Sequence, residues 1–298
     1  MKKFLAIAGL LVVCLGKSKA QDVQYSKDSS VMAVNNTVTI ANSNYAADVK
    51  RPSPYKTSWR KDGWITLGLI GVNAGGLYLI QNKKDLTPAQ LAMKSRDDVP
   101  SFDRGNVGYF DEKANDASYI PFYASFAWPV AMMLIDGDQT RNFGQVLGMY
   151  VETMAVAGAM YTMAAGTVNR SRPLVYSNDA PVGTRMSKNS QRSFFAGHTA
   201  ATAASTFFTA KVFSDMNPDS KLKPVVWVVA AAVPALVGYY RYKAGQHFLS
   251  DNILGYGLGA ATGILIPHWH KVKKSDRLSI YPGFGPNYQG LAMVYKIR

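Results

Sequence analysis

Six long apolar segments, separated by polar loops, constrain the fold more than any other feature of this sequence. The segments are rich in Ala, Leu, Gly and Met and are 15 to 23 residues long. This composition and these lengths favour helices over strands. We therefore expect an all-α fold, a six-helix bundle, with helices at 64–80, 119–135, 146–168, 199–213, 225–240 and 253–269.

The sequence leaves open whether these helices cross a membrane. Most segments are 15 to 17 residues long, shorter than the roughly 20 residues that a bilayer requires. Glu152 lies inside the third segment, and the mean hydropathy is only -0.06. In favour of spanning, the basic run from His268 to Lys274 would form a cytoplasmic anchor after the sixth segment.

The parity of the segments argues against a simple six-span topology. If an N-terminal signal is cleaved, six spans return the chain to the side on which it started, which conflicts with a cytoplasmic anchor. Three alternatives remain open. The first is that one of the six segments does not cross the membrane, and the second is that the N-terminal signal is not cleaved. The third is that the bundle is a periplasmic domain that rests on the membrane.

The N-terminal residues have the three-part pattern of a secretory signal. Lys2 and Lys3 precede an apolar run, and a small-residue ending at Ala20 follows it. We predict a signal peptide at 1–20 and export to the cell envelope, facing the periplasm. Cys14, the single cysteine, lies in this segment, so the mature chain would have no disulfide or cysteine-bound metal. The bulky Val13 before it disfavours lipidation.

The remaining chain divides by composition. Residues 21–63 are polar and are predicted to be an extended leader, and residues 64–270 form the main domain. Residues 271–298 are predicted to be a basic linker and a short C-terminal β-hairpin, because Leu291, Met293, Tyr295 and Ile297 alternate with other residues.

The charge of the chain indicates an anionic partner. The 33 Lys and Arg residues exceed the 19 Asp and Glu residues, which gives a formal net charge of +14. Such a surface attracts phosphates, nucleic acids or acidic lipid headgroups. No zinc-finger spacing or basic-aromatic repeat is present, so we expect an anionic membrane surface and not nucleic acid. No obligate protein partner is inferred.

Three polar clusters lie at the ends of the expected helices. An anion site needs planar guanidinium donors and free backbone N–H groups at a helix start. Arg172 and Arg241 supply the first, and Gly197 opens a helix that supplies the second. We expect His247 to be a nucleophile beside this anion site. Asp251, four residues later, provides a carboxylate that can hold one ring nitrogen of His247, and His198 is the expected acid.

Simpler interpretations of the same residues remain. Arg172 followed by Pro173 is also an ordinary basic helix end, and Asp251 could serve only as a helix cap. His247 and Asp251 could bind a metal, but no third ligand follows at a telling spacing, so we expect neither metal nor cofactor.

Together the clusters resemble the signature of the type 2 phosphatidic acid phosphatase (PAP2) superfamily, which includes acid phosphatases and vanadium haloperoxidases. That signature is Lys-x6-Arg-Pro, then Pro-Ser-Gly-His, then Ser-Arg-x5-His-x3-Asp. The matching positions here are Arg172-Pro173, Gly197-His198 and Arg241-x5-His247-x3-Asp251.

The resemblance implies a metal-independent phosphatase with a PAP2-like bundle. His247 would become phosphohistidine, Asp251 would orient it, and His198 would protonate the leaving group. Arg172, Arg241 and the Gly197 amide would bind the phosphate.

Three positions depart from the signature. Its lysine, proline and serine are replaced by Ala165, Phe195 and Ala196. The two alanines remove a cation and a hydroxyl donor. Auxiliary cations from the same loop could replace the lost charge, and the candidates are Arg170, Lys188 and Arg192.

The expected function is hydrolysis of a phosphate monoester or diphosphate, on a phosphorylated lipid or a small phosphate ester. A nonspecific periplasmic acid phosphatase is the near alternative. A vanadium haloperoxidase has nothing in this chain in its favour. The two alanines leave a different class open, an envelope protein that binds a phospholipid without catalysis.

Overall fold

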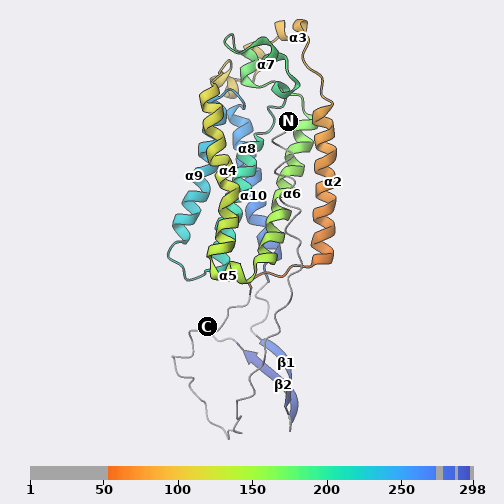
Figure 1. The fold of residues 1–298 in the computed structure, drawn as a ribbon, viewed down its shortest axis with the longest axis vertical. Coiled ribbons are helices and arrows are strands. Elements are labelled where there is room, and N and C mark those ends of the chain that lie inside the picture. The colour runs from red at the N-terminus through yellow and green to blue at the C-terminus, as the bar shows by residue number, and fades with distance from the viewer. Residues whose placement is uncertain (1–52, 273–277, 286–287, 296–298) are drawn as a thin grey trace. The chain divides into compact units, whose positions relative to one another are not determined.

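The computed structural model describes residues 53–272, 278–285 and 288–295. The predicted signal peptide and residues 21–52 of the predicted leader lie outside these residues. Residues 51–298 form one compact unit by their contacts, and its described part is dominated by helices (Figure 1).

Six long helices in the described residues confirm the predicted bundle (Figure 1). They are α2 (Trp59–Gln81), α4 (Glu112–Ile135), α6 (Phe143–Thr167), α8 (Gly197–Met216), α9 (Lys223–Lys243) and α10 (Leu249–His270). Each is longer than the apolar run that predicted it, because polar residues extend its ends. Ser58 and Asp111, for example, cap α2 and α4 by accepting hydrogen bonds from backbone N–H groups.

The expectation that most helices are too short for a bilayer is therefore wrong. The six helices are 20 to 25 residues long. Among the described residues, α2, α4 and α9 are long and apolar enough to cross a membrane. Their outward side chains include Trp64 (74% exposed), Ile120 (77%) and Val228 (67%). An apolar surface of this extent supports association with a membrane.

The charge inside the third segment is turned into the bundle and does not oppose this association. Glu152 is buried, and its carboxylate lies 3.4 Å from Nε2 of His270 at the end of α10. Asp62 of α2 lies at the same distance from that nitrogen. His270 is therefore part of a polar cluster with Glu152 and Asp62.

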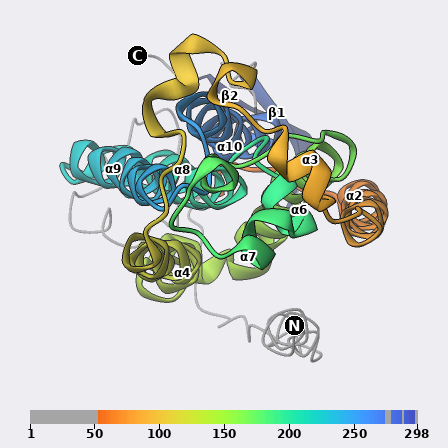
Figure 2. The same cartoon turned by 90° about the horizontal axis from the view of Figure 1, so that it is seen from above.

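Helix α8 is the centre of the bundle and packs against α10, α9, α4 and α6, while α2 packs outside against α6 (Figure 2). The approach of α10 to α8 depends on three glycines spaced by four residues. A Cβ atom would lie 2.6, 2.1 and 2.5 Å from the carbonyl oxygens of α8 or its N-cap at Gly255, Gly259 and Gly263, respectively. Only glycine allows this close packing, which brings the N-termini of the two helices together.

Short helices form the loops between these long ones. They are α3 (Pro88–Ala92), η2 (Arg96–Asp98), η3 (Ser101–Asn106), α5 (Gly137–Arg141), η4 (Pro173–Tyr176), α7 (Val182–Met186) and η5 (Lys188–Gln191). At the chain entry, Tyr55 is buried, donates a hydrogen bond to Asp215 at 2.9 Å and pairs through its backbone with Lys271. Tyr55 is thus part of the core, although the sequence placed it in the leader.

After α10 the structure describes two strands, β1 (Leu278–Gly285) and β2 (Tyr288–Tyr295). They pair antiparallel, from Leu278 opposite Tyr295 to Gly285 opposite Tyr288. Residues 286–287 between them lie outside the described residues, so the hairpin connection stays a prediction.

Candidate active site

His247 lies in the short loop between α9 and α10 and is 1% exposed. Gly245, with a φ of +67°, allows the chain to turn at this loop, and a Cβ there would meet the carbonyl oxygen of Tyr109 at 1.8 Å. Nδ1 of His247 lies 2.6 Å from the carbonyl oxygen of Ser193. Since a carbonyl only accepts, Nδ1 carries the proton and Nε2 keeps its lone pair.

The electrostatic surroundings keep His247 neutral. Burial, followed by the charges of Arg172 and Arg241, lowers the pKa of His247 well below its ordinary value, and the charge of His198 contributes in the same direction. A neutral imidazole with a free Nε2 has the protonation state that a nucleophile needs.

The structure corrects the expected role of Asp251, because its carboxylate does not hold the ring of His247. One oxygen, Oδ2, accepts from the hydroxyl of Ser193 at 2.6 Å and from the backbone N–H of Phe248 at 3.0 Å. The Ser193 carbonyl in turn holds His247. Asp251 thus positions the histidine through Ser193, and its bond to Phe248 also caps the start of α10.

Arg170 is likewise placed differently from the expectation, because it does not replace the lost phosphate-binding cation. Its two terminal nitrogens lie 2.5 Å from Asp251 Oδ1 and 2.5 Å from Asp103 Oδ2. Both carboxylate side chains are fully buried. Asp103 of η3 is held by the N–H and hydroxyl of Ser250, at 2.9 and 2.6 Å. Arg170 is therefore the central cation of a buried network that reaches His247 through Asp251 and Ser193.

Arg172 and Arg241 converge on the side-chain amide oxygen of Gln246, the residue that precedes His247 in the chain. Both are at most 5% exposed, and both donate a hydrogen bond to Oε1 of Gln246. Arg241 also donates to Oδ1 of Asn115 at 2.8 Å. Neither guanidinium has a carboxylate partner among the described residues, and the Nε of each is buried without a hydrogen bond.

Two buried like charges with free donors are costly without an anion. Burial and then the charge of Arg241 lower the pKa of Arg172 to about 9. An anion placed between the two guanidiniums would offset this cost and pair with the unpaired Nε–H groups. This arrangement of donors fits an oxyanion.

His198 begins α8 beside this site. Its ring packs against Tyr119 and Phe122, with centroid separations of 5.5 and 4.4 Å. Ala196 occupies the N-cap position and provides no side-chain cap, so the first N–H groups of α8 remain available to an anion. This helix start was predicted from Gly197.

Glycine is required at position 197 by a neighbouring side chain. A Cβ at Gly197 would lie 2.5 to 2.8 Å from ring atoms of Tyr161 on α6. The space is filled by this phenol ring, so the position has no room for a larger side chain.

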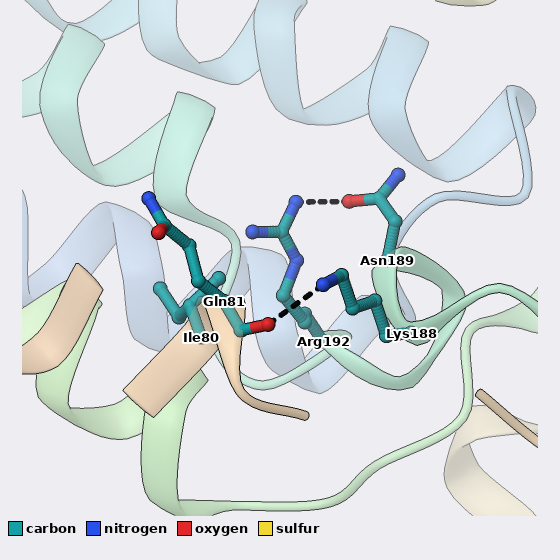
Figure 3. Close-up of a pocket in the computed structure, with 5 residues that line it drawn as sticks. All are labelled: Ile80, Gln81, Lys188, Asn189 and Arg192. Carbon is teal, nitrogen blue, oxygen red and sulfur yellow. Dashed lines mark hydrogen bonds between the residues drawn. The ribbon is translucent and has the colours of Figure 1, made fainter. Parts of the chain in front are cut away.

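The alanines at the departures from the signature are enclosed. Ala165 and Ala196 are both 0% exposed, and Phe195 is 3% exposed. The other two auxiliary candidates, Lys188 and Arg192, line a hollow against the end of α2 (Figure 3).

Sequence reasoning missed several residues of this site, namely Asp103, Asn106, Gln246, Ser193 (considered only as a cap) and Tyr161. Asn106 donates to the carbonyls of His247 and Tyr242, at 2.9 and 3.0 Å. Asp103 and Asn106 precede the first motif by more than 60 residues, and no spacing pattern marks them. Gln246 precedes His247 in the sequence, and this position next to a candidate histidine is a signal that could have identified it.

No group of three or more His, Cys, Asp or Glu side chains in the described part of the chain is arranged to hold a metal ion.

Comparison with known proteins supports the family that the motifs indicate. The family model of the PAP2 superfamily matches residues 147–275, a range that contains all three clusters. The match confirms the resemblance to this superfamily.

A solved structure, the first transmembrane PAP2 type phosphatidylglycerolphosphate phosphatase from Bacillus subtilis, is similar at 18% identity. The similarity covers 70% of this chain and 98% of that one, with a TM-score of 0.43. No curated protein matches the chain.

Proposed function

We propose that this protein is a phosphatase that hydrolyses a phosphate monoester or diphosphate, on a lipid. The observation that carries the proposal is the pair of buried guanidiniums of Arg172 and Arg241, with unpaired Nε–H groups, beside a neutral buried histidine. The PAP2 superfamily match over residues 147–275 supports the same reaction class.

In the proposed mechanism, Nε2 of His247 attacks phosphorus while the bond to the leaving oxygen breaks. His198 gives its proton to that oxygen, which leaves as an alcohol or, from a diphosphate, as a phosphate. Water then attacks the phosphohistidine, His198 takes its proton, and inorganic phosphate leaves. Arg172, Arg241 and the N–H of Gly197 stabilise the charge on the equatorial oxygens.

His198 can act as an acid only when the phosphate is bound. In the free protein, burial and the charges of Arg241 and Arg172 lower the pKa of His198 well below its ordinary value. A bound phosphate dianion offsets the two guanidinium charges and so favours the protonated imidazole. Substrate binding would thereby create the acid that the first step needs.

A lipid substrate is supported by the apolar outer surface of the bundle, with α2, α4 and α9 long enough to cross a bilayer. The N-terminal signal pattern and the absence of cysteine after Cys14 support export to the envelope. The proposal needs no metal or cofactor, since both chemical steps use only protein side chains and water.

The test is release of inorganic phosphate by the purified protein across a panel of lipid and soluble phosphates, with His247→Ala as the control. We expect release by the wild type alone, unaffected by a chelator. Equal rates for both proteins would refute the phosphatase. Activity that fractionates with the soluble phase and prefers soluble esters would favour the acid phosphatase.

A non-catalytic phospholipid-binding protein is the second candidate, and the enclosed alanines at 165 and 196 favour it. Each lost hydrogen bond to a charged phosphate is worth roughly 1.5–3 kcal/mol, or about ten- to a few-hundredfold in rate. Binding of phosphorylated vesicles without phosphate release would identify this function.

A further inference from the structure

The guanidiniums of Arg172 and Arg241 meet at one uncharged oxygen atom. Oε1 of Gln246 accepts a hydrogen bond from Nη1 of Arg172 and another from Nη2 of Arg241, the second at 3.3 Å. Both arginines are buried, and they stand 74 and 5 positions before Gln246 in the chain. A single side-chain amide therefore joins two segments that are distant in the sequence.

The backbone around Gln246 is attached to the same two segments. The N–H of Gln246 donates to the carbonyl oxygen of Arg241 at 3.0 Å, and the carbonyl oxygen of Gly245 accepts from the N–H of Leu174 at 3.0 Å. Leu174 lies two residues after Arg172. Both arginine segments thus hold the backbone that carries the amide, which limits the positions that this side chain can take.

Gln246 leaves free the donors that an anion needs. Nε of Arg172 and Nε of Arg241 are both buried without a hydrogen bond, whereas the bonds to Gln246 use terminal nitrogens. A guanidinium carries its N–H donors in a rigid fork, so one terminal nitrogen can be held while other donors bind an oxyanion. Gln246 and a bound anion therefore do not require the same atoms.

The acceptors that orient these arginines are uncharged amides. Besides Gln246, Oδ1 of Asn115 on α4 accepts from Nη1 of Arg241 at 2.8 Å. Arg170, in contrast, is paired with two carboxylates. A carboxylate beside Arg172 or Arg241 would also hold the guanidinium, but it would cancel part of the positive charge. An amide oxygen orients the guanidinium and leaves the charge available to an anion.

We propose that Gln246 is a positioning residue of the anion site, whose amide oxygen holds Arg172 and Arg241 together and keeps both positive charges available for a phosphoryl group. This role lies within the anion site of the proposed phosphatase and rests on that function. It requires the side chain at position 246 to be an acceptor and also to be uncharged.

The test measures the affinity for inorganic phosphate, by calorimetry on the purified full chain and as an inhibition constant with a phosphate monoester. Gln246→Glu keeps the size and the acceptor and adds one negative charge. We expect phosphate to bind about ten- to a hundredfold more weakly, because a like charge then lies a few ångströms from the anion. The melting temperature without phosphate should rise, because the new carboxylate pairs with two buried cations. A residue that only supports the fold would lower affinity and stability together.

Two further variants separate the acceptor from the charge. Gln246→Met removes the acceptor and adds no charge, so phosphate should bind about three- to tenfold more weakly, with a lower melting temperature. Asn115→Asp adds a carboxylate from a different helix. Of the two arginines, Asn115 contacts Arg241 alone, so the loss of affinity should be smaller than in Gln246→Glu.

Gln145→Glu is the matched control. Gln145 is partly buried, as Gln246 is, and its Nε2 donates to the carbonyl oxygen of Tyr55 at 3.0 Å. It follows α5, which lies at the end of the bundle away from α7 (Figure 1). This variant should leave the phosphate affinity unchanged.

Unchanged phosphate affinity in Gln246→Glu would overturn the proposed role, and so would an equal loss in Gln145→Glu or a joint fall of affinity and stability in Gln246→Glu. If Gln246→Glu does not fold, Asn115→Asp decides, and unchanged affinity in that variant overturns the role. Wild-type protein that binds phosphate but releases none from any substrate, as His247→Ala does, would refute the phosphatase alone. Calorimetry would still test Gln246 in that case.

Discussion

Replacing Arg170 by alanine tests the buried network behind His247. The substitution removes two contacts of 2.5 Å to carboxylates that are fully buried, Asp103 and Asp251. Breaking a buried ion pair from one side costs about 3–5 kcal/mol, because a buried charge is left uncompensated. Asp103 keeps two hydrogen bonds from Ser250, and Asp251 keeps bonds from Ser193 and Phe248. We therefore expect the lower end, about 3 kcal/mol of unfolding free energy.

The kinetic consequence separates positioning from phosphate binding. If Arg170 acts on His247 through Asp251 and Ser193, Arg170→Ala lowers kcat by about ten- to a hundredfold. The inhibition constant of inorganic phosphate should then change little, because Arg172 and Arg241 remain. If Arg170 binds phosphate instead, that constant should rise with KM. Initial rates with a monoester and competition by phosphate measure both quantities.

A double-mutant cycle provides the control. Asp103→Asn removes one of the two carboxylates that Arg170→Ala leaves unpaired, so the double variant should be more stable than the sum of the single effects by at least about 1 kcal/mol. Arg170→Lys should recover only part of the loss, since one ammonium cannot match a planar guanidinium that spans two carboxylates. Additive stabilities, or an Arg170→Ala protein with wild-type kcat, would refute the reasoning.

Three further predictions follow from the same site. Buried His247 stays neutral in the folded protein, while the same side chain in the unfolded chain binds a proton below about pH 6.5, so folding stability falls as the pH drops. The loss of folding free energy between pH 7.5 and 5.5 should be about 1 to 1.5 kcal/mol. Denaturant titrations at the two pH values should show that this loss is absent in His247→Asn. Gly197→Ala should destabilise the protein by about 1–3 kcal/mol, since its Cβ would meet the Tyr161 ring at 2.5 Å, and the denaturation midpoint checks this. Ala196→Ser restores a hydroxyl at the uncapped start of α8. It should raise kcat/KM about tenfold and the free energy of unfolding by up to ~1 kcal/mol. An unchanged kcat/KM would show that the missing serine does not limit catalysis.

The sequence predicted the helical bundle well and the helix ends poorly. Apolar composition identified all six long helices, but not polar extensions such as Trp59 to Gly63 at the start of α2. End positions depend on caps and on contacts with distant loops, which a local window of sequence does not contain. The same limit explains why Tyr55 was assigned to a leader, although it is buried against Asp215.

The active-site prediction was similarly divided. Guanidinium and imidazole chemistry at helix ends led the sequence analysis to Arg172, Arg241, His198 and His247, and the anion-binding and catalytic roles of these residues stay predictions. The expected pairing of Asp251 with His247 was wrong, although their spacing of four residues suggested it. His247 lies before the first turn of α10 and not within a helix, so helical spacing does not bring the two side chains together.

What the sequence by itself determined is the set of chemical groups, together with the helices whose ends carry them. What only the tertiary structure decided is which group faces which. Arg170 and Arg172 have the same side chain and stand two residues apart, yet one pairs with carboxylates 67 and 81 positions away and the other faces the anion site without a carboxylate. The difference arises from backbone pairing across the loop and from the glycine-mediated packing of α10 on α8, and both are contacts between residues distant in the chain.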